Sequence, residues 1–303
     1  MVAVVFRKIT IVGVGLIGGS FALALKKAHA VEQVMGVGRS EAVLARAAEL
    51  GIVDRIATSM EEAADGADLV LIATPVAQTG AILGALAPFL QPHTIVTDAG
   101  STKGDVVAAA RLALGSKIGQ FVPGHPIAGR ESNGPGAALA DLYVGKKAVL
   151  TPLPENASAA VERVASAWSA CGAVVHRLSA RQHDRIFAAV SHLPHLLAYA
   201  LVDQIERAPE AELLFQYAAS GFRDFTRIAG SSPEMWRDIA LANQPALLSE
   251  IEAYASQLAR LKTLLTGSDG EGLYAMFANA QHARQAWQGA IEAVEKQPKT
   301  GGD

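Results

Sequence analysis

The chain has 303 residues, of which half are hydrophobic and 18% charged, with a formal net charge of −3. So much apolar material excludes intrinsic disorder, and the length suggests two domains. Because basic residues are not in excess, nucleic acid and anionic membrane surfaces are poor partners. The single cysteine, Cys171, can form neither an internal disulfide nor a thiolate metal site. We therefore expect a soluble cytoplasmic protein.

Short apolar runs alternate with helix-forming segments in the first half of the chain. We predict strands over residues 8–12, 34–37, 68–74, 94–98, 147–150 and 173–176, and helices that include 16–30, 41–50 and 155–171. Near-continuous apolar runs are typical of strands buried on both faces of a parallel sheet. Residues 1–178 are therefore predicted to form a Rossmann-like, doubly wound α/β domain. The most apolar stretch, 9–25, is interrupted by four glycines, which argues against a membrane span.

Beyond residue 178 the pattern changes to long helical segments. These are predicted over residues 180–207, 211–222, 233–243, 245–265 and 271–295, separated by proline and glycine. Residues 179–303 are therefore predicted to form an all-helical domain. The apolar excess suggests that this domain dimerises, because obligate interfaces are as hydrophobic as a domain core.

A glycine motif follows the first predicted strand. Residues 13–18 read G-x-G-x-x-G and lead into the first helix. In such motifs the first glycine allows a tight turn, the second admits a pyrophosphate, and the third packs helix against strand. The helix N-terminus adds free N–H groups and a positive dipole end. This context predicts dinucleotide binding. The residues expected at the cofactor are Gly13, Gly15, Leu16, Ile17, Gly18, Arg39, Ser40, Thr74, Pro75 and Ser101.

The acidic residue that would bind the ribose hydroxyls of NAD is missing. Gly38 stands at its expected place, followed by Arg39 and Ser40. Without the carboxylate, a 2′-phosphate meets no repulsion, and Arg39 with Ser40 can bind it. We therefore expect NADP to be preferred, with NAD possible. In the alternative interpretation, Arg39 is a solvated residue at a helix start.

Four further segments combine chemically versatile side chains. They are residues 98–103 (DAGSTK), a loop over 124–132 (GHPIAGRES), 191–195 within a helix (SHLPH), and 221–227 (GFRDFTR). Each has an ordinary alternative: loop histidines are often structural, and arginines often pair with nearby carboxylates. H-x-x-H is half a metal site, but no third ligand has suitable spacing, so no metal is expected. Together with a dinucleotide, the segments indicate a dehydrogenase for an anionic substrate.

These motifs, in this order, resemble the prephenate/arogenate (cyclohexadienyl) dehydrogenases. The resemblance rests on GVGLIGGS, DAGSTK, GHPIAGRE, SHLPH and DFTR with Met235-Trp236, and it extends from about residue 8 to about 265. Gly38 departs from the pattern, because NAD-specific members carry Asp there. The resemblance implies oxidative decarboxylation of prephenate to 4-hydroxyphenylpyruvate, or of arogenate to tyrosine, in tyrosine biosynthesis. It further implies a homodimer and is compatible with feedback inhibition by tyrosine.

The resemblance also implies roles for individual residues. His125 would draw the proton from the substrate's C4 hydroxyl, and Ser101 would bind that hydroxyl or orient His125. Arg227 would hold the ring carboxylate. The remaining expected substrate-pocket residues are Ser191, His192, His195, Glu131 at the rim, and Trp236 near the substrate's side chain.

Two other interpretations remain open at this point. A β-hydroxyacid dehydrogenase shares the two-domain plan, but its catalytic lysine would have to be Lys262, which stands late in the chain. A nucleotide-sensing regulator without catalysis would have no need of His125, Ser101 and Arg227. The choice between prephenate and arogenate is likewise left open by the sequence.

Overall fold

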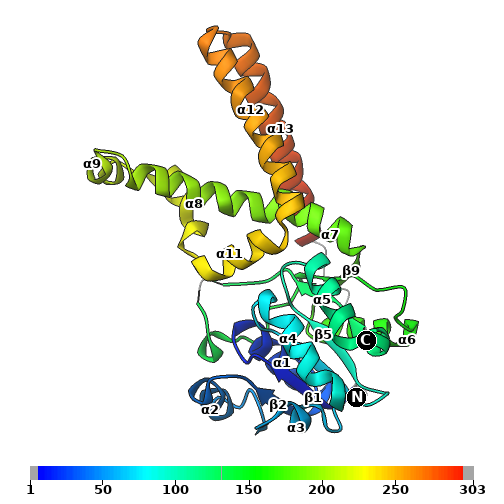
Figure 1. Ribbon diagram of the computed structural model, residues 1–303. Coiled ribbons are helices and arrows are strands. Elements are labelled where there is room, and N and C mark those ends of the chain that lie inside the picture. Colours follow the sequence, from blue (N-terminus) through cyan, green and yellow to red (C-terminus); the bar gives the residue numbers. More distant parts are fainter. Residues whose placement is uncertain (1–5, 131, 296–303) are drawn as a thin grey trace. The chain divides into compact units, whose positions relative to one another are not determined.

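A computed structural model describes residues 6–130 and 132–295 of the chain (Figure 1). The chain divides into two compact units after Leu247. The first unit holds both sheets and the helices that follow them directly. The predicted boundary after residue 178 instead separates the strand-containing part from the helices, and it lies within this first unit.

A six-stranded parallel sheet forms the centre of the first unit, which confirms the predicted doubly wound plan. Its strand order is β3-β2-β1-β4-β5-β6. The strands are β1 (Phe6–Val12), β2 (Val31–Val37), β3 (Arg55–Ile56), β4 (Leu69–Ile72), β5 (Ile95–Asp98) and β6 (Phe121–Val122). All five pairings are parallel. The two-residue strands β3 and β6 were not predicted, because so short a segment carries no periodicity.

Apolar side chains are buried on both faces of this sheet. Along β4, Leu69 and Leu71 belong to one core cluster, while Val70 and Ile72 belong to the other. This alternation follows from the two-residue period of a strand. The helices that supply the two clusters are α1 (Leu16–Lys27), α2 (Glu41–Glu49), α3 (Met60–Ala64), α4 (Thr79–Leu86), α5 (Gly104–Leu114) and α6 (Ser158–Ala170). Helices on both faces explain the continuous apolar runs of the sequence.

A second sheet of three strands carries the histidine segment. Its strands, in the order β7-β8-β9, are β7 (Gly124–Pro126), β8 (Lys147–Leu150) and β9 (Val174–Arg177). β7 runs antiparallel to β8, and His125 is paired with Val149. The prediction of a loop over residues 124–132 is therefore wrong at its start. A three-residue strand escapes pattern reading, and its edge position tolerates Pro126.

Helices make up the part of the chain that the structure describes after β9. They are α7 (Ala180–Phe187), α8 (Leu193–Glu206), α9 (Ala211–Gln216), α10 (Ser220–Thr226), α11 (Pro233–Ala242), α12 (Gln244–Thr266) and α13 (Gly270–Glu295). The single helix predicted over residues 211–222 is two helices. In the second unit, α13 and most of α12 leave large apolar side chains exposed, among them Leu258, Leu265, Tyr274, Phe277 and Trp287.

A π turn over Ala188–His192 joins α7 to α8. Pro194 begins the next turn and cannot donate the N–H that a regular helix requires, so a local change of helical register precedes it. The combined run, residues 180–206, is long and apolar enough to cross a membrane by length and composition alone. Core helices of soluble proteins meet the same criterion, and His183 and His192 of this run are buried within the protein.

A buried ion pair fixes the edge of the main sheet beside β7. Asp98, at the end of β5, accepts a hydrogen bond from the Nζ of Lys103, and both side chains are almost completely buried. The same carboxylate accepts the N–H of Gly100 at 2.8 Å and the N–H of Gly124 at 3.0 Å. Asp98 thereby ties β5, the loop after it and β7 together.

Replacing Lys103 with methionine is expected to lower the free energy of unfolding by about 3–5 kcal/mol, because it leaves a buried carboxylate without its counterion. Urea unfolding of Lys103→Met and of the control Lys27→Met, on the exposed end of α1, measures this difference. Equal stability of the two variants would contradict the expectation.

Candidate functional site

The glycine motif adopts the geometry that its three roles require. Gly13 has a φ of +94°, and a Cβ there would lie 2.8 Å from the carbonyl oxygen of Ala73. A Cβ on Gly18 would lie 2.4 Å from the carbonyl oxygen of Gly13, so helix and strand pack too closely for a side chain. A Cβ on Gly15 would meet nothing within 4 Å. The open approach is thus at the middle glycine, where α1 begins without a side-chain cap.

Thr74 faces this turn from the end of β4. Its methyl carbon is one of the atoms closest to Gly13. Its hydroxyl is buried and has no hydrogen-bond partner among the residues described. A buried, unpartnered hydroxyl carries an energetic cost that a bound polar group relieves. The open glycine and this hydroxyl together fit a dinucleotide phosphate.

The end of β2 is open as well. A Cβ on Gly38 would have Leu44 Cδ2 as its nearest contact, at 3.8 Å, so steric crowding does not explain the absence of a side chain there. Arg39 and Ser40 are exposed. The Oγ of Ser40 accepts the N–H of Val43 at 3.3 Å and caps α2, which leaves its own O–H available as a donor. A cation and a capped helix start therefore stand where the adenosine ribose is expected.

His125 is held by a short chain of hydrogen-bonding side chains. Its Nδ1 lies 2.8 Å from the Nε2 of His183, and the Nδ1 of His183 lies 2.8 Å from the Oδ1 of Asp184. The carboxylate of Asp184 also accepts the N–H of Lys103 at 2.8 Å and that of Gly104 at 2.7 Å. The first helix after the sheets, α7, is thus joined both to the start of α5 and to β7.

The protonation of this chain follows from burial and neighbouring charges. Burial lowers the pKa of His125 well below its usual range, and electrostatic interactions with His183, Lys103 and His192 lower it further. Burial likewise lowers the pKa of His183, against the opposing effect of Asp184. For Asp184, burial raises the pKa, but hydrogen bonds from His183, Gly104 and Lys103 outweigh it and leave the pKa lowered. At neutral pH the set is a carboxylate and two neutral imidazoles.

Ser101 lies in the loop between β5 and α5 and is partly buried. Its side chain makes no hydrogen bond to another described residue. The side chain that hydrogen-bonds to the ring of His125 is His183. The sequence interpretation did not identify His183 and Asp184. Their helix, ARQHDRIF, is polar at most positions and resembles a solvated surface helix.

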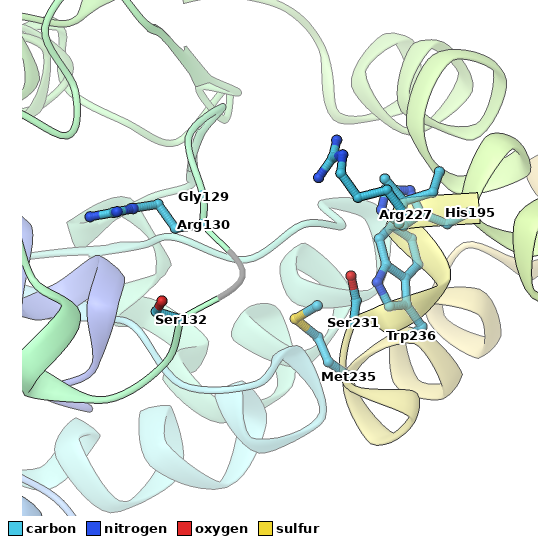
Figure 2. A pocket seen from close by; sticks show the side chains of 9 residues that line it. Gly129, Arg130, Ser132, His195, Arg227, Ser231, Met235 and Trp236 are labelled. Carbon is cyan, nitrogen blue, oxygen red and sulfur yellow. The ribbon is translucent and has the colours of Figure 1, made fainter. Parts of the chain in front are cut away.

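A cavity of about 470 Å³ lies between the segment after β7 and the helices around α8 and α11 (Figure 2). Of the predicted site residues it collects His195, Arg227 and Trp236. Figure 2 shows Arg130 and Ser132 on the side opposite this trio. The full lining is Gly129, Arg130, Ser132, His195, Arg227, Ile228, Ser231, Met235 and Trp236.

The indole of Trp236 forms one wall of this cavity. It is 8% exposed and stacks on the ring of His195, with centroids 3.6 Å apart. Its Nε1 is buried and has no hydrogen-bond partner in the described part of the chain. The Nδ1 of His195 lies 2.9 Å from the carbonyl oxygen of Ser191, to which it donates. Ser191 thus contributes its main chain to the orientation of His195.

His192 is 1% exposed and lies behind Trp236, with ring centroids 6.0 Å apart. Its Nδ1 lies 3.1 Å from the Nδ2 of Asn243, which also donates to the carbonyl oxygen of Asp184 at 2.8 Å. Burial, reinforced by His183, lowers the pKa of His192 to about 4. His192 is therefore neutral and links the cavity wall to the chain that holds His125.

The cavity combines neutral histidines with cationic side chains. Burial lowers the pKa of His195, and the charge of Arg227 contributes to that shift. Arg227 and Arg130 bring two guanidinium cations to its lining, so the cavity is suited to an anion. Glu131, predicted at the rim, lies outside the described residues. Among those described, no group of three His, Cys, Asp or Glu side chains is arranged to hold a metal ion.

Comparisons with known proteins match both halves of the chain. The nucleotide-binding domain model of prephenate dehydrogenase matches residues 21–177, and the dimerization domain model matches residues 179–279. The cyclohexadienyl dehydrogenase of Zymomonas mobilis is 37% identical over 93% of this chain and 96% of its own length.

Two solved structures extend this similarity. The prephenate dehydrogenase of Aquifex aeolicus, in complex with hydroxyphenyl propionate and NAD+, is 38% identical with a TM-score of 0.87, covering 92% of this chain and 98% of the other. The arogenate dehydrogenase of Synechocystis is 29% identical with a TM-score of 0.80, covering 93% and 100%. Both domain models and these relatives span nearly the whole chain, and the chain belongs to the prephenate dehydrogenase family.

Proposed function

We propose that this protein oxidatively decarboxylates prephenate, arogenate or both, passing hydride to a nicotinamide dinucleotide in tyrosine biosynthesis. The observation that carries the proposal is His125, a neutral imidazole held through its Nδ1 by a buried His183–Asp184 pair. Asn243 and His192 connect this arrangement to Trp236 in the wall of the cavity that contains Arg227. Membership of the family supports the reaction.

The role of His125 is to take the proton of the substrate's C4 hydroxyl. With Nδ1 engaged by His183, the Nε2 of a neutral His125 is the nitrogen left to act as the base. As the O–H bond yields its proton, hydride leaves C4 and the C1 carboxylate leaves as CO2, so the ring becomes aromatic. The bound nicotinamide supplies the hydride acceptor. His125 then returns the proton to the phenolic oxygen, which balances the reaction.

The cavity residues are proposed to bind the substrate's charged groups. Arg227 offers a charge-assisted fork to the ring carboxylate, and Trp236 offers an unpartnered Nε1–H to the side chain. His195 and, behind it, His192 and Ser191 fix the wall on which the substrate rests. Ser101 is proposed to bind the C4 hydroxyl, since its own hydroxyl is unengaged by the described side chains, and Glu131 to stand at the rim.

We propose that NADP is the preferred cofactor, with NAD accepted more weakly. The support comes from the end of β2, where Arg39 and the capping Ser40 are exposed and Gly38 carries no carboxylate. Relatives of the chain include one solved with NAD+, so the difference would lie in these residues and not in the glycine motif.

We further propose a cytoplasmic homodimer assembled through the helical residues 179–303. The match to the dimerization domain model and the exposed apolar side chains of α12 and α13 support it. Inhibition by tyrosine is part of the proposal, because 4-hydroxyphenylpyruvate differs from tyrosine only by a keto group in place of the amino group, and the product of arogenate is tyrosine itself.

Purified protein is expected to oxidise prephenate or arogenate. The assay measures the near-ultraviolet absorbance of the reduced nicotinamide for each substrate with each cofactor. His125→Asn should lower kcat by about 10²–10⁴-fold and leave cofactor affinity unchanged, because only the base is lost. Since the neutral base is required and burial depresses its pKa, kcat should fall only as pH drops below 6.5. Oxidation of neither substrate, or a loss below about tenfold in the variant, would refute the proposal.

Arg227→Ala is expected to raise KM about ten- to a hundredfold with a smaller change in kcat, because a charged hydrogen bond contributes about 1.5–3 kcal/mol to binding. Arg223→Ala is the matched control, since Arg223 lies one turn earlier and is exposed beside Asp224. Steady-state kinetics of both variants make the comparison, and an unchanged KM for Arg227→Ala would contradict the assigned contact.

Arg39→Ala is expected to weaken NADP+ binding by about tenfold or more while leaving NAD+ binding nearly unchanged, because it removes the partner of the 2′-phosphate. Gly38→Asp should shift preference toward NAD+, since the open position admits a carboxylate. Calorimetric dissociation constants for both cofactors test this, with Arg46→Ala on α2 as control. A preference for NAD+ in the unmodified protein that Arg39→Ala does not alter would exclude the proposed role.

A further inference from the structure

We infer that His183 and Asp184 are positioning residues that determine which ring nitrogen of His125 carries its proton. The inference rests on the proposed function for its catalytic consequence, but the tautomer itself is a property of the protein without substrate. The geometry comes from three elements, with Asp184 and His183 on α7, the start of α5, and His125 on β7.

Asp184 determines which atoms donate and which accept in this chain of hydrogen bonds. An ionised carboxylate only accepts hydrogen bonds, and its oxygens already receive the N–H groups of Lys103 and Gly104. Those two backbone donors cannot be reversed, so they fix the carboxylate as an acceptor. The Nδ1 of His183, 2.8 Å from Oδ1, must therefore carry a proton and donate it.

The donor in the hydrogen bond between His183 and His125 is determined in turn. His183 is completely buried, which favours its neutral form, so its Nε2 holds a lone pair once Nδ1 is protonated. The Nδ1 of His125 lies 2.8 Å from this Nε2 and must donate a hydrogen bond to its lone pair. A neutral His125 with a proton on Nδ1 has its own lone pair on Nε2. That lone pair is what a general base requires.

The surroundings of the pair keep it in place. α7 begins with a capping box between Ser179 and Gln182. Phe187, one turn after His183, packs against both imidazoles, with ring centroids 5.0 Å from His125 and 4.5 Å from His183. Asn243 donates to the main-chain oxygen of Asp184. The orientation of the chain is thus supported from α7, α5 and the residue after α11.

The same chain stabilises the charge that the reaction places on His125. When Nε2 takes up a proton, the ring becomes an imidazolium whose Nδ1–H still donates to His183. The Asp184 carboxylate lies beyond His183 and attracts this positive charge, which burial and Lys103 disfavour. No proton has to move beyond His125 for this stabilisation.

Asp184→Ala separates this role from simple packing. The Oδ1 of Asp184 receives both the Nδ1–H of His183 and the N–H of Lys103, so this variant removes the acceptor that fixes the proton of His183. Without that acceptor His183 can carry its proton on either ring nitrogen, and His125 is no longer held with its lone pair on Nε2. We expect kcat to fall by about tenfold or more, with KM and cofactor affinity within about twofold of the unmodified protein.

Nitrogen-15 NMR of the histidine rings reads the tautomers directly and needs no substrate. The unmodified protein at neutral pH should show His125 protonated on Nδ1, and Asp184→Ala should show a mixture of its two neutral tautomers. If the unmodified protein carries the proton on Nε2, the inference is wrong whatever the enzyme's activity. If the tautomer is as inferred but neither substrate is oxidised, the proposed function fails and the positioning stands.

A second pair of variants covers the case in which Asp184→Ala does not fold. His183→Gln offers an amide oxygen to the Nδ1–H of His125 and should retain the tautomer and at least tenfold more activity than His183→Leu. Equal kcat in these two variants would overturn the inference. His176→Gln and Asp203→Asn, both at exposed positions, are controls that should leave kcat unchanged.

Discussion

The carboxylate of Asp184 is the contact on which the candidate site depends. It accepts two backbone N–H groups at the start of α5 and the Nδ1–H of His183. One side chain thereby joins the helical part of the chain to the carboxyl edge of the parallel sheet. Parallel sheets bind ligands at this edge, so the histidine chain is built where a dinucleotide and its substrate would meet.

Burial and charge act together on the histidines of this region. Lys103 is buried against Asp98, and its charge helps to keep His125 neutral. His192 is neutral for the same reasons of burial and neighbouring charge. The cations that line the cavity, Arg130 and Arg227, are by contrast exposed to solvent. In the proposed mechanism, the neutral base and the cation that binds the anionic substrate are thus separate side chains.

The features that could be predicted from the sequence are those that depend on a local pattern of residues. The apolar runs of β1, β4 and β5 predicted a buried parallel sheet, and the roles of Gly13, Gly15 and Gly18 followed from their spacing. These features depend on neighbours close in the chain or on one repeating period. Strands of two or three residues, such as β7, have no period to read, so His125 was placed in a loop.

Other parts of the site depend on contacts between distant residues. His183 meets His125 across 58 positions of sequence, and its helix is polar enough to pass for a surface helix. His192 and His195 share one motif, yet one is buried behind Trp236 and the other lines the cavity, because a π turn and Pro194 alter the register between α7 and α8. No spacing rule distinguishes the two.

A crystal structure with the oxidised cofactor and 4-hydroxyphenylpyruvate tests the account most directly. It should place the phenolic oxygen within about 2.6–3.2 Å of the Nε2 of His125, with the Nδ1 of that ring still on His183. The phenolic oxygen bound away from His125, or a ring of His125 turned so that Nε2 faces His183, would contradict the account.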